Sequence, residues 1–179
     1  ASTLNAHFTS KTVVNAIWQA VQRFGLKNGS ILEPSVGSGN FFGLMPGELR
    51  PHSKFLAVEL DPLTSAIARH LYPEAEIYGA RGFEEINVGE NRFDLAIGNP
   101  PFDSMTIKDK FNKELEFNLH GFFFAKSIEA VRPGGIMAMV VSRYWMDNNT
   151  TGKAARQYVA DRARLLGAIR LPNNAFRSN

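Results

Sequence analysis

The chain contains no cysteine, which excludes a disulfide framework and a zinc site built from thiolates. It has no apolar run near the roughly 20 residues that a membrane-spanning helix needs. The net charge is only +3, which permits a nucleic-acid partner without requiring one. The 179 residues, 44% of them hydrophobic, suffice for one globular domain with a full core, and we expect a cytoplasmic location and no membrane partner.

Hydrophobic periodicity predicts an alternation of strands and helices. Val13, Ile17 and Val21 recur at helical spacing, for example, and Gly25 ends that helix. Such an alternation is typical of an α/β fold, a mostly parallel sheet with helices on both faces. The predicted helices are 10–24, 41–49, 62–71, 119–131 and 153–164; the predicted strands are 30–34, 54–60, 75–78, 93–97, 136–141 and 166–171; residues 103–118 are predicted to be a loop.

A glycine-rich turn follows the first predicted strand, in the segment ILEPSVGSGNFF over residues 31–42. Gly37 and Gly39 allow the backbone to turn sharply and to approach a ligand closely. The spacing is not the dinucleotide GxGxxG, and no lysine follows as it does in a P-loop. The carboxylate of Glu33, at the end of the strand, disfavours a pyrophosphate and suits a ligand with a cationic end.

Glu59 ends the second strand, where an acid can accept both ribose hydroxyls of a nucleoside. Two acids around a glycine turn describe a pocket for a nucleoside that carries an ammonium group, and S-adenosylmethionine has that chemistry. The alternative is a tight turn beside a solvated acid pair. The residues expected to bind the cofactor from these two segments are Glu33, Pro34, Ser35, Gly37, Gly39, Asn40, Phe41, Glu59 and Leu60.

The tetrapeptide Asn99-Pro100-Pro101-Phe102 ends the fourth strand. Two acceptors aimed at the hydrogens of an exocyclic amine can pull its delocalised nitrogen toward a pyramidal, nucleophilic form, and the Asn99 side chain and the Pro100 carbonyl can supply them. Successive prolines hold both oxygens in place, so little reorganisation is needed as charge develops. Phe102 can stack on a base, and the transfer needs no metal. The alternative is a strand-end turn with a core phenylalanine.

These segments, EPSVGSGNF, VELDP and IGNPPF, resemble in order and spacing the S-adenosylmethionine-dependent adenine-N6 DNA methyltransferases whose cofactor motifs precede the catalytic motif. The resemblance covers nearly the whole chain. It implies a Rossmann-like class I methyltransferase fold, a cofactor contact for Asn99, DNA as the partner with its target adenine flipped out, and a bacterial or phage origin. It also implies a single catalytic domain over 1–179, with an N-terminal helix at 9–25, a cofactor half at 30–90 and a catalytic half at 91–179.

The same resemblance suggests supporting residues. Phe8 and Thr9 would hold the methionine carboxylate, although Thr9 can equally cap the first helix. Phe83 and Glu84 stand where the family has an Asp-Phe pair at the cofactor adenine, and this chain lacks the aspartate. Phe176, in LPNNAF, would stack on the flipped base or simply end a strand.

Lys108 and Lys110 lie in the predicted loop after NPPF and can contact DNA phosphates, or they can simply be solvated.

The family's fold normally adds a final antiparallel strand and a separate target-recognition region, and we expect this chain to lack both and to belong to a larger protein. Two rival functions stay open. NPP(F/Y) also occurs in enzymes that methylate guanine N2 of ribosomal RNA or glutamine amides of proteins. The domain could alternatively be a non-catalytic module that binds cofactor or DNA within a larger assembly.

Overall fold

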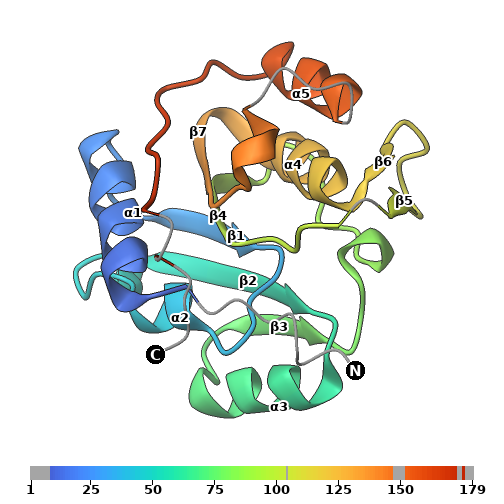
Figure 1. Ribbon diagram of the computed structural model, residues 1–179. Coiled ribbons are helices and arrows are strands. Elements are labelled where there is room, and N and C mark those ends of the chain that lie inside the picture. Colours follow the sequence, from blue (N-terminus) through green and yellow to red (C-terminus); the bar gives the residue numbers. More distant parts are fainter. Residues whose placement is uncertain (1–8, 104, 147–151, 173–174, 176–179) are drawn as a thin grey trace.

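The computed structural model describes residues 9–103, 105–146, 152–172 and 175 (Figure 1). Its centre is a parallel five-stranded sheet in the order β3-β2-β1-β4-β7. The order reverses at β1, because β2 and β3 extend the sheet to one side and β4 and β7 to the other. Ligands of such sheets bind at the carboxyl ends of the strands beside this switch point. The strands are β1 (Gly29–Glu33), β2 (Ser53–Glu59), β3 (Glu76–Gly79), β4 (Phe93–Gly98) and β7 (Val131–Met139).

Local signals account for the helix boundaries. Ser10 caps the first helix by accepting a hydrogen bond from the Val13 amide. Asp61 caps the third through the Thr64 amide at 2.8 Å, and Pro62 takes the first helical position, where its missing N–H costs nothing. The helices are α1 (Lys11–Arg23), α2 (Asn40–Gly43), α3 (Pro62–Leu71), α4 (Leu119–Ala130) and α5 (Lys153–Ala160), with short 3-10 turns η2 (Arg50–His52), η3 (Phe83–Glu85) and η4 (Arg143–Trp145).

Two hydrophobic cores cover the two faces of the sheet, as the α/β prediction requires. Ile31 and Leu95 point into the core that contains α1, α2 and part of α3. Leu32 and Ala96, one position further along the same strands, point into the core against α4. This alternation holds the strands rigidly between the helix layers, so their carboxyl ends are fixed relative to one another.

The structure corrects three predicted elements. The helix expected over 41–49 is limited to the single turn α2, and Pro46 lies in the turns that follow. The expected loop 103–118 contains an antiparallel pair, β5 (Thr106–Lys108) and β6 (Glu116–Asn118). Strands of three residues are too short to display a periodicity of two, which is why the sequence did not reveal them.

The sixth predicted strand, 166–171, does not form. The segment after α5 is extended and runs back across the molecule toward α1 (Figure 1). Leu166 is 48% exposed and Ile169 is 82% exposed, so the apolar side chains that suggested a strand have no sheet to cover. Among the described residues, no strand pairs antiparallel with β7. None of the helices described is long and apolar enough to cross a membrane.

Candidate active site at the switch point

Glu33 occupies the carboxyl end of β1 and is almost completely buried, with 1% of its surface exposed. Its Oε2 atom has no hydrogen-bond partner. Burial raises the pKa of this carboxyl well above its ordinary value, and the neighbouring charge of Glu59 raises the pKa further. A buried acceptor without a donor is costly, so the arrangement suits a ligand that brings a cationic or N–H group to this point.

Glu59, at the end of β2, braces the glycine turn. Its Oε2 accepts a hydrogen bond from the Gly37 amide at 2.8 Å, and its Oε1 accepts one from the Asp61 amide at 2.9 Å. Each carboxylate oxygen has a second lone pair, so Glu59 can still accept hydroxyl hydrogens. Leu60, the next residue, is 69% exposed at the same edge.

The two glycines of the turn have different surroundings. Gly37 (φ 54°) and Gly39 (φ 85°) both adopt left-handed backbone conformations that favour glycine. A Cβ on Gly37 would meet no atom within 4 Å, whereas one on Gly39 would lie 2.3 Å from the ring of Tyr72. Gly37 therefore faces open space at the ligand edge, and Gly39 is packed against the protein.

Thr9 lies next to this turn, because the side-chain amide of Asn40 donates to its carbonyl at 3.2 Å. Thr9 is buried, and Ser10 rather than Thr9 caps α1. Phe41 belongs to the core, where its carbonyl accepts the indole N–H of Trp18 at 2.9 Å. Pro34 is buried and Ser35 is half-buried in the same turn, while Phe8 lies outside the described residues.

Phe83 and Glu84 have unequal positions after β3. Phe83 is 2% exposed, and its ring packs between Phe122, at 6.0 Å between centroids, and Phe123, at 5.3 Å. The expected stacking of Phe83 on the cofactor therefore finds no exposed ring face. The Glu84 carboxylate folds back over Gly82, where a Cβ would lie 2.2 Å from Oε1. Glu84 thus fills the space that a side chain at position 82 would occupy.

The NPPF segment begins where β4 ends, beside the glycine turn that follows β1. A Cβ on Gly98 would lie 3.5 Å from Glu33 Cγ and 3.7 Å from Pro34 Cδ, so the ends of the paired strands β1 and β4 lie side by side. The side-chain oxygen of Asn99 is shielded from solvent. Pro100 is buried and Pro101 is exposed, while Phe102 is 39% exposed. The motif therefore leads from the buried strand end outward to an accessible aromatic ring.

His120 is a residue of this region that the sequence analysis missed. It lies in the first turn of α4, with 7% of its surface exposed and no partner for Nε2. Its ring lies 4.9 Å from Phe102, 5.0 Å from Trp145 and 5.3 Å from Phe124, centroid to centroid. Burial lowers the pKa of His120 to about 4, so its ring is neutral at physiological pH. The ring packs in an aromatic cluster with Phe102, Phe124 and Trp145.

The two lysines expected at phosphates are engaged in exposed ion pairs. Lys108 Nζ lies 2.7 Å from Glu116, and Lys110 Nζ lies 2.5 Å from Glu85. Exposed pairs of this kind contribute about 0–1 kcal/mol, so a phosphate can compete for either ammonium. Phe176 lies outside the described residues.

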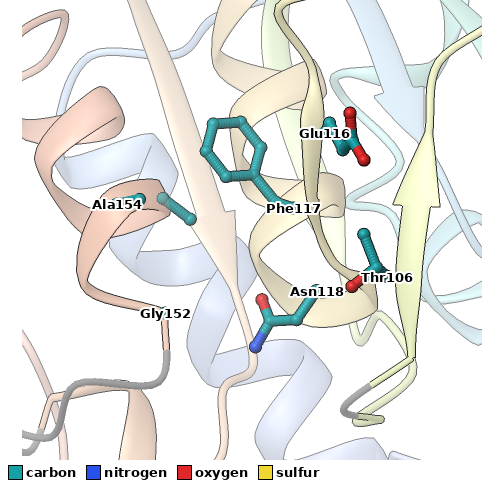
Figure 2. A pocket seen from close by; sticks show the side chains of 7 residues that line it. Thr106, Glu116, Phe117, Asn118, Gly152 and Ala154 are labelled. Atoms are coloured by element: carbon teal, nitrogen blue, oxygen red, sulfur yellow. The ribbon is translucent and has the colours of Figure 1, made fainter.

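Two hollows lie away from the switch point. One of about 390 Å³ separates the β5–β6 hairpin from the start of α5 (Figure 2); its lining includes Glu116, Phe117, Asn118 and Gly152. The other, of about 270 Å³, lies at the starts of β1, β2 and β4, the opposite edge of the sheet. Neither includes Glu33, Glu59 or Asn99, so the candidate site rests on the strand-end geometry. Among the described residues, no three or more His, Asp or Glu side chains gather as metal ligands would.

The fold is that of the class I S-adenosylmethionine-dependent methyltransferases. A protein from Listeria monocytogenes, described as a candidate member of that class, has a TM-score of 0.77 at 16% sequence identity. The match covers 99% of this chain and 59% of the other. This agrees with the fold class predicted from the sequence.

The family follows from the sequence comparison. The model of the Eco57I restriction-modification methylase family matches residues 55–176, and the chain belongs to this family. The resemblance to the adenine-N6 DNA methyltransferase family that was drawn from the motifs is thereby confirmed. Fold and family together define an S-adenosylmethionine-dependent methyltransferase domain of the restriction-modification type.

Two relatives show how much of a longer protein the chain represents. It is 31% identical over 137 residues to the type II methyltransferase M.TthHB8I of Thermus thermophilus, a match that covers 67% of this chain and 31% of that protein. It is 28% identical over 182 residues to the defense against restriction protein B of Escherichia phage P1, covering 98% of this chain and 8% of that protein. The chain thus spans less than a third of each relative.

Proposed function

We propose that this domain transfers a methyl group from S-adenosylmethionine to the N6 amino group of adenine in DNA. The observation that carries the proposal is that the carboxyl ends of the paired strands β1 and β4 lie side by side at Glu33 and Gly98. This arrangement brings the buried, unsatisfied carboxylate of Glu33 beside the start of the NPPF motif. A cationic methyl donor and an amine acceptor can therefore meet at one edge of the sheet.

The cofactor half of the proposal fits the donor and acceptor groups present. Glu33 would accept from the ammonium end, because its orphaned oxygen is shielded from water. Glu59 would accept ribose hydroxyls while still holding the Gly37 amide. Glu84, folded over Gly82, would take the adenine contact that the family assigns to an aspartate. Thr9 adjoins the same turn through its hydrogen bond from Asn40 and would contact the methionine carboxylate.

The catalytic half uses position rather than acid–base strength. When bound, S-adenosylmethionine supplies a methyl carbon activated by its sulfonium; the N6 lone pair forms the new bond as the carbon–sulfur bond breaks, and an N6 proton passes to water. Asn99 and the Pro100 carbonyl would accept from the two N6 hydrogens, held in place by the successive prolines.

Phe102 would stack on the flipped base, a contact worth about 1–3 kcal/mol, while the His120 ring packs against Phe102. Lys108 and Lys110 would exchange their exposed carboxylates for phosphates, and Phe176 would complete the stack from the late motif.

Transfer of a tritiated methyl group from labelled cofactor tests this function, with DNA, ribosomal RNA and a protein carrying glutamine amides as parallel substrates. Mass spectrometry of the product then identifies the methylated atom. N6-methyladenine in DNA is the expected product. Detection of N2-methylguanine in RNA or of a methylated glutamine would show that adenine is not the target. Absence of any methyl transfer by a longer protein that contains this domain would refute the enzymatic proposal.

A second candidate is a non-catalytic cofactor- or DNA-binding module of a larger assembly. The observation that favours it is the phage P1 relative, which this chain matches over 98% of its own length but only 8% of that protein. Cofactor binding by calorimetry together with no tritium transfer to any of the three substrates would support this candidate.

A further inference from the structure

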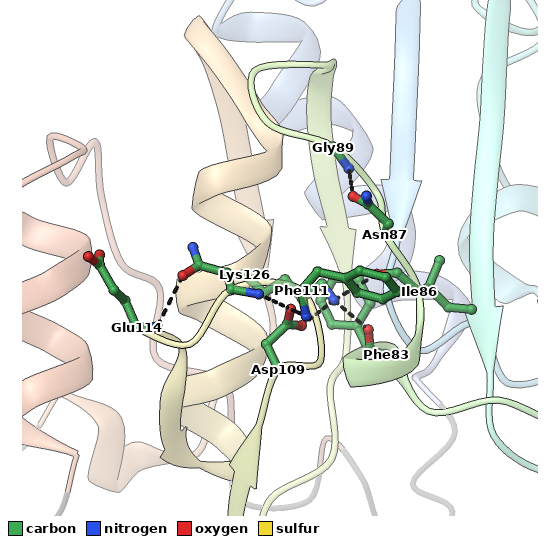
Figure 3. A network of polar contacts seen from close by, with 9 residues as sticks. Phe83, Ile86, Asn87, Gly89, Asp109, Phe111, Glu114 and Lys126 are labelled. Atoms are coloured by element: carbon green, nitrogen blue, oxygen red, sulfur yellow. Dashed lines mark hydrogen bonds and ion pairs between the residues drawn. The ribbon is translucent and has the colours of Figure 1, made fainter.

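A buried lysine joins three segments around the candidate site (Figure 3). Lys126, on α4, is 4% exposed, and its Nζ donates to the carbonyls of Phe83 and Ile86, both at 2.7 Å. Its third bond is an ion pair with Oδ2 of Asp109. An ammonium has three N–H donors, so every donor of Lys126 is matched to one acceptor.

Both carboxylate oxygens of Asp109 also accept hydrogen bonds. The residue is 7% exposed, and its Oδ1 accepts from the backbone amides of Phe111 and Asn112, both at 2.8 Å. This turn follows β5 and therefore belongs to the stretch that the NPPF motif leads into. Asp109 thus orders the turn after β5 and also pairs with the charge of Lys126.

The carbonyls that Lys126 holds belong to the cofactor side. They lie on either side of Glu84, the residue whose carboxylate covers Gly82. The Lys126 ammonium also lies 4.8 Å from the centroid of the Phe83 ring, which anchors the same segment in the core. One side chain therefore connects α4, the segment that carries Glu84, and the turn after β5.

Stability alone does not account for such a pair. Burial lowers the pKa of Lys126, and the hydrogen bond and charge of Asp109 oppose that shift. Because desolvation of both ions offsets much of their attraction, apolar replacements of buried pairs are often neutral in stability. What a buried pair with matched donors can add is one defined conformation of the segments that it joins.

We propose that Lys126 is a positioning residue that sets Glu84 against the cofactor adenine and couples this contact to the turn held by Asp109. The inference rests on the proposed function, since it assigns Glu84 to the cofactor. Lys126 itself touches neither substrate; it acts through the backbone of residues 83–86 on one side and through Asp109 on the other.

The variant Lys126→Met combined with Asp109→Asn tests the proposal. It removes both charges, but residue 109 keeps an oxygen for the amides of Phe111 and Asn112. Calorimetry with S-adenosylmethionine alone is expected to show a rise in Kd of about tenfold, the equivalent of one positioned hydrogen bond. Arg162→Met is the matched control, because it removes an exposed ion pair to Glu129, which lies on α4 like Lys126. The Kd of this variant for S-adenosylmethionine should not change.

A double-mutant cycle with Glu84→Gln separates positioning from a general loss of packing. Glu84→Gln alone should also raise Kd about tenfold, and adding it to the Lys126 and Asp109 changes should cost less than about threefold more. Additive effects, or an unchanged Kd in a folded variant, would overturn the inference. A wild type that binds no S-adenosylmethionine would refute the proposed function instead, so the two failures are distinguishable.

Hydrogen exchange of the wild type tests the coupling between Glu84 and the turn held by Asp109 without any substitution. This measurement tests the proposal even if the substituted protein does not fold. Addition of S-adenosylmethionine should slow exchange of the Phe111 and Asn112 amides, because cofactor contact with Glu84 tightens the segment that Lys126 shares with Asp109. Unchanged exchange at these two amides, with the cofactor bound, would overturn the proposed coupling.

Discussion

Substitution of the two glycines in the turn after β1 should separate an effect on stability from an effect on ligand binding. Gly37 and Gly39 both have positive φ, so alanine at either position carries the left-handed penalty of about 1–2 kcal/mol. Only position 39 adds a collision, because its Cβ would lie 2.3 Å from Cε2 and 2.8 Å from Cδ2 of Tyr72. The pair therefore differs in packing and not in backbone conformation.

The Tyr72 ring cannot simply move aside. It makes an edge contact with Phe42 at 4.9 Å between centroids, and its hydroxyl would lie 2.4 Å from a Cβ on Gly43. Overpacking of this kind costs about 1–3 kcal/mol, so Gly39→Ala should lose roughly 2–5 kcal/mol in total. Gly37→Ala should lose only the left-handed penalty.

Urea denaturation of both variants measures these losses as changes in the free energy of unfolding. Tyr72→Leu combined with Gly39→Ala should recover part of the loss, because the smaller side chain removes the collision. Equal losses for Gly37→Ala and Gly39→Ala, within about 0.5 kcal/mol, would refute the packing argument.

Calorimetry with S-adenosylmethionine supplies the second measurement. The methyl group of Gly37→Ala would project into the open space beside the turn, where the cofactor is proposed to bind. Its Kd should rise by at least about tenfold, as expected when a backbone that must approach a ligand gains a side chain. Tight binding by Gly37→Ala would mean that the cofactor does not approach this turn.

Three further outcomes follow from the site. Asn99→Ala should abolish methyl transfer in a variant that remains folded, and retained turnover would exclude Asn99 as an acceptor for the amine. His120 has a folded-state pKa of about 4 against an ordinary 6.5, so it contributes stability that is lost as pH falls from 6.5 toward 4, up to about 3 kcal/mol. His120→Phe should flatten that part of the pH–stability profile measured by urea denaturation, and an unchanged profile would contradict the assignment. Because the pKa of Glu33 is raised, a cationic cofactor should bind more weakly as pH falls below it; Glu33→Gln should bind poorly at every pH, and a matching pH dependence in that variant would point to another group.

Elements with local signals matched their predictions closely. Residues 62–71 were predicted as a helix and form α3 over Pro62–Leu71, because Asp61 and Pro62 act within one turn of the helix start. The predicted strand 93–97 forms β4, whose apolar run is continuous because both faces are buried. Residues 166–171 failed as a strand, since β pairing requires a neighbour that local sequence does not specify.

Some residues of the candidate site could likewise be predicted from the sequence, and others could not. Glu33, Glu59 and Asn99 were predicted as site residues from their places at strand ends, and the parallel sheet brings those ends to one edge. His120 and Lys126 were missed, although both interrupt the apolar run of α4 and could have been noticed there. Asp109 gave no comparable signal, because its partner is 17 positions away in the chain.

The amino-acid order by itself determined the alternation of strands and helices and the polar residues that follow each strand, since propensity, capping and periodicity act over a few residues. The tertiary structure decided which of those polar groups meet and in what state. Glu33 and Glu59 influence each other only because β1 and β2 are adjacent. Burial by distant segments leaves Glu33 unsatisfied and His120 neutral, and such burial depends on the packed chain as a whole.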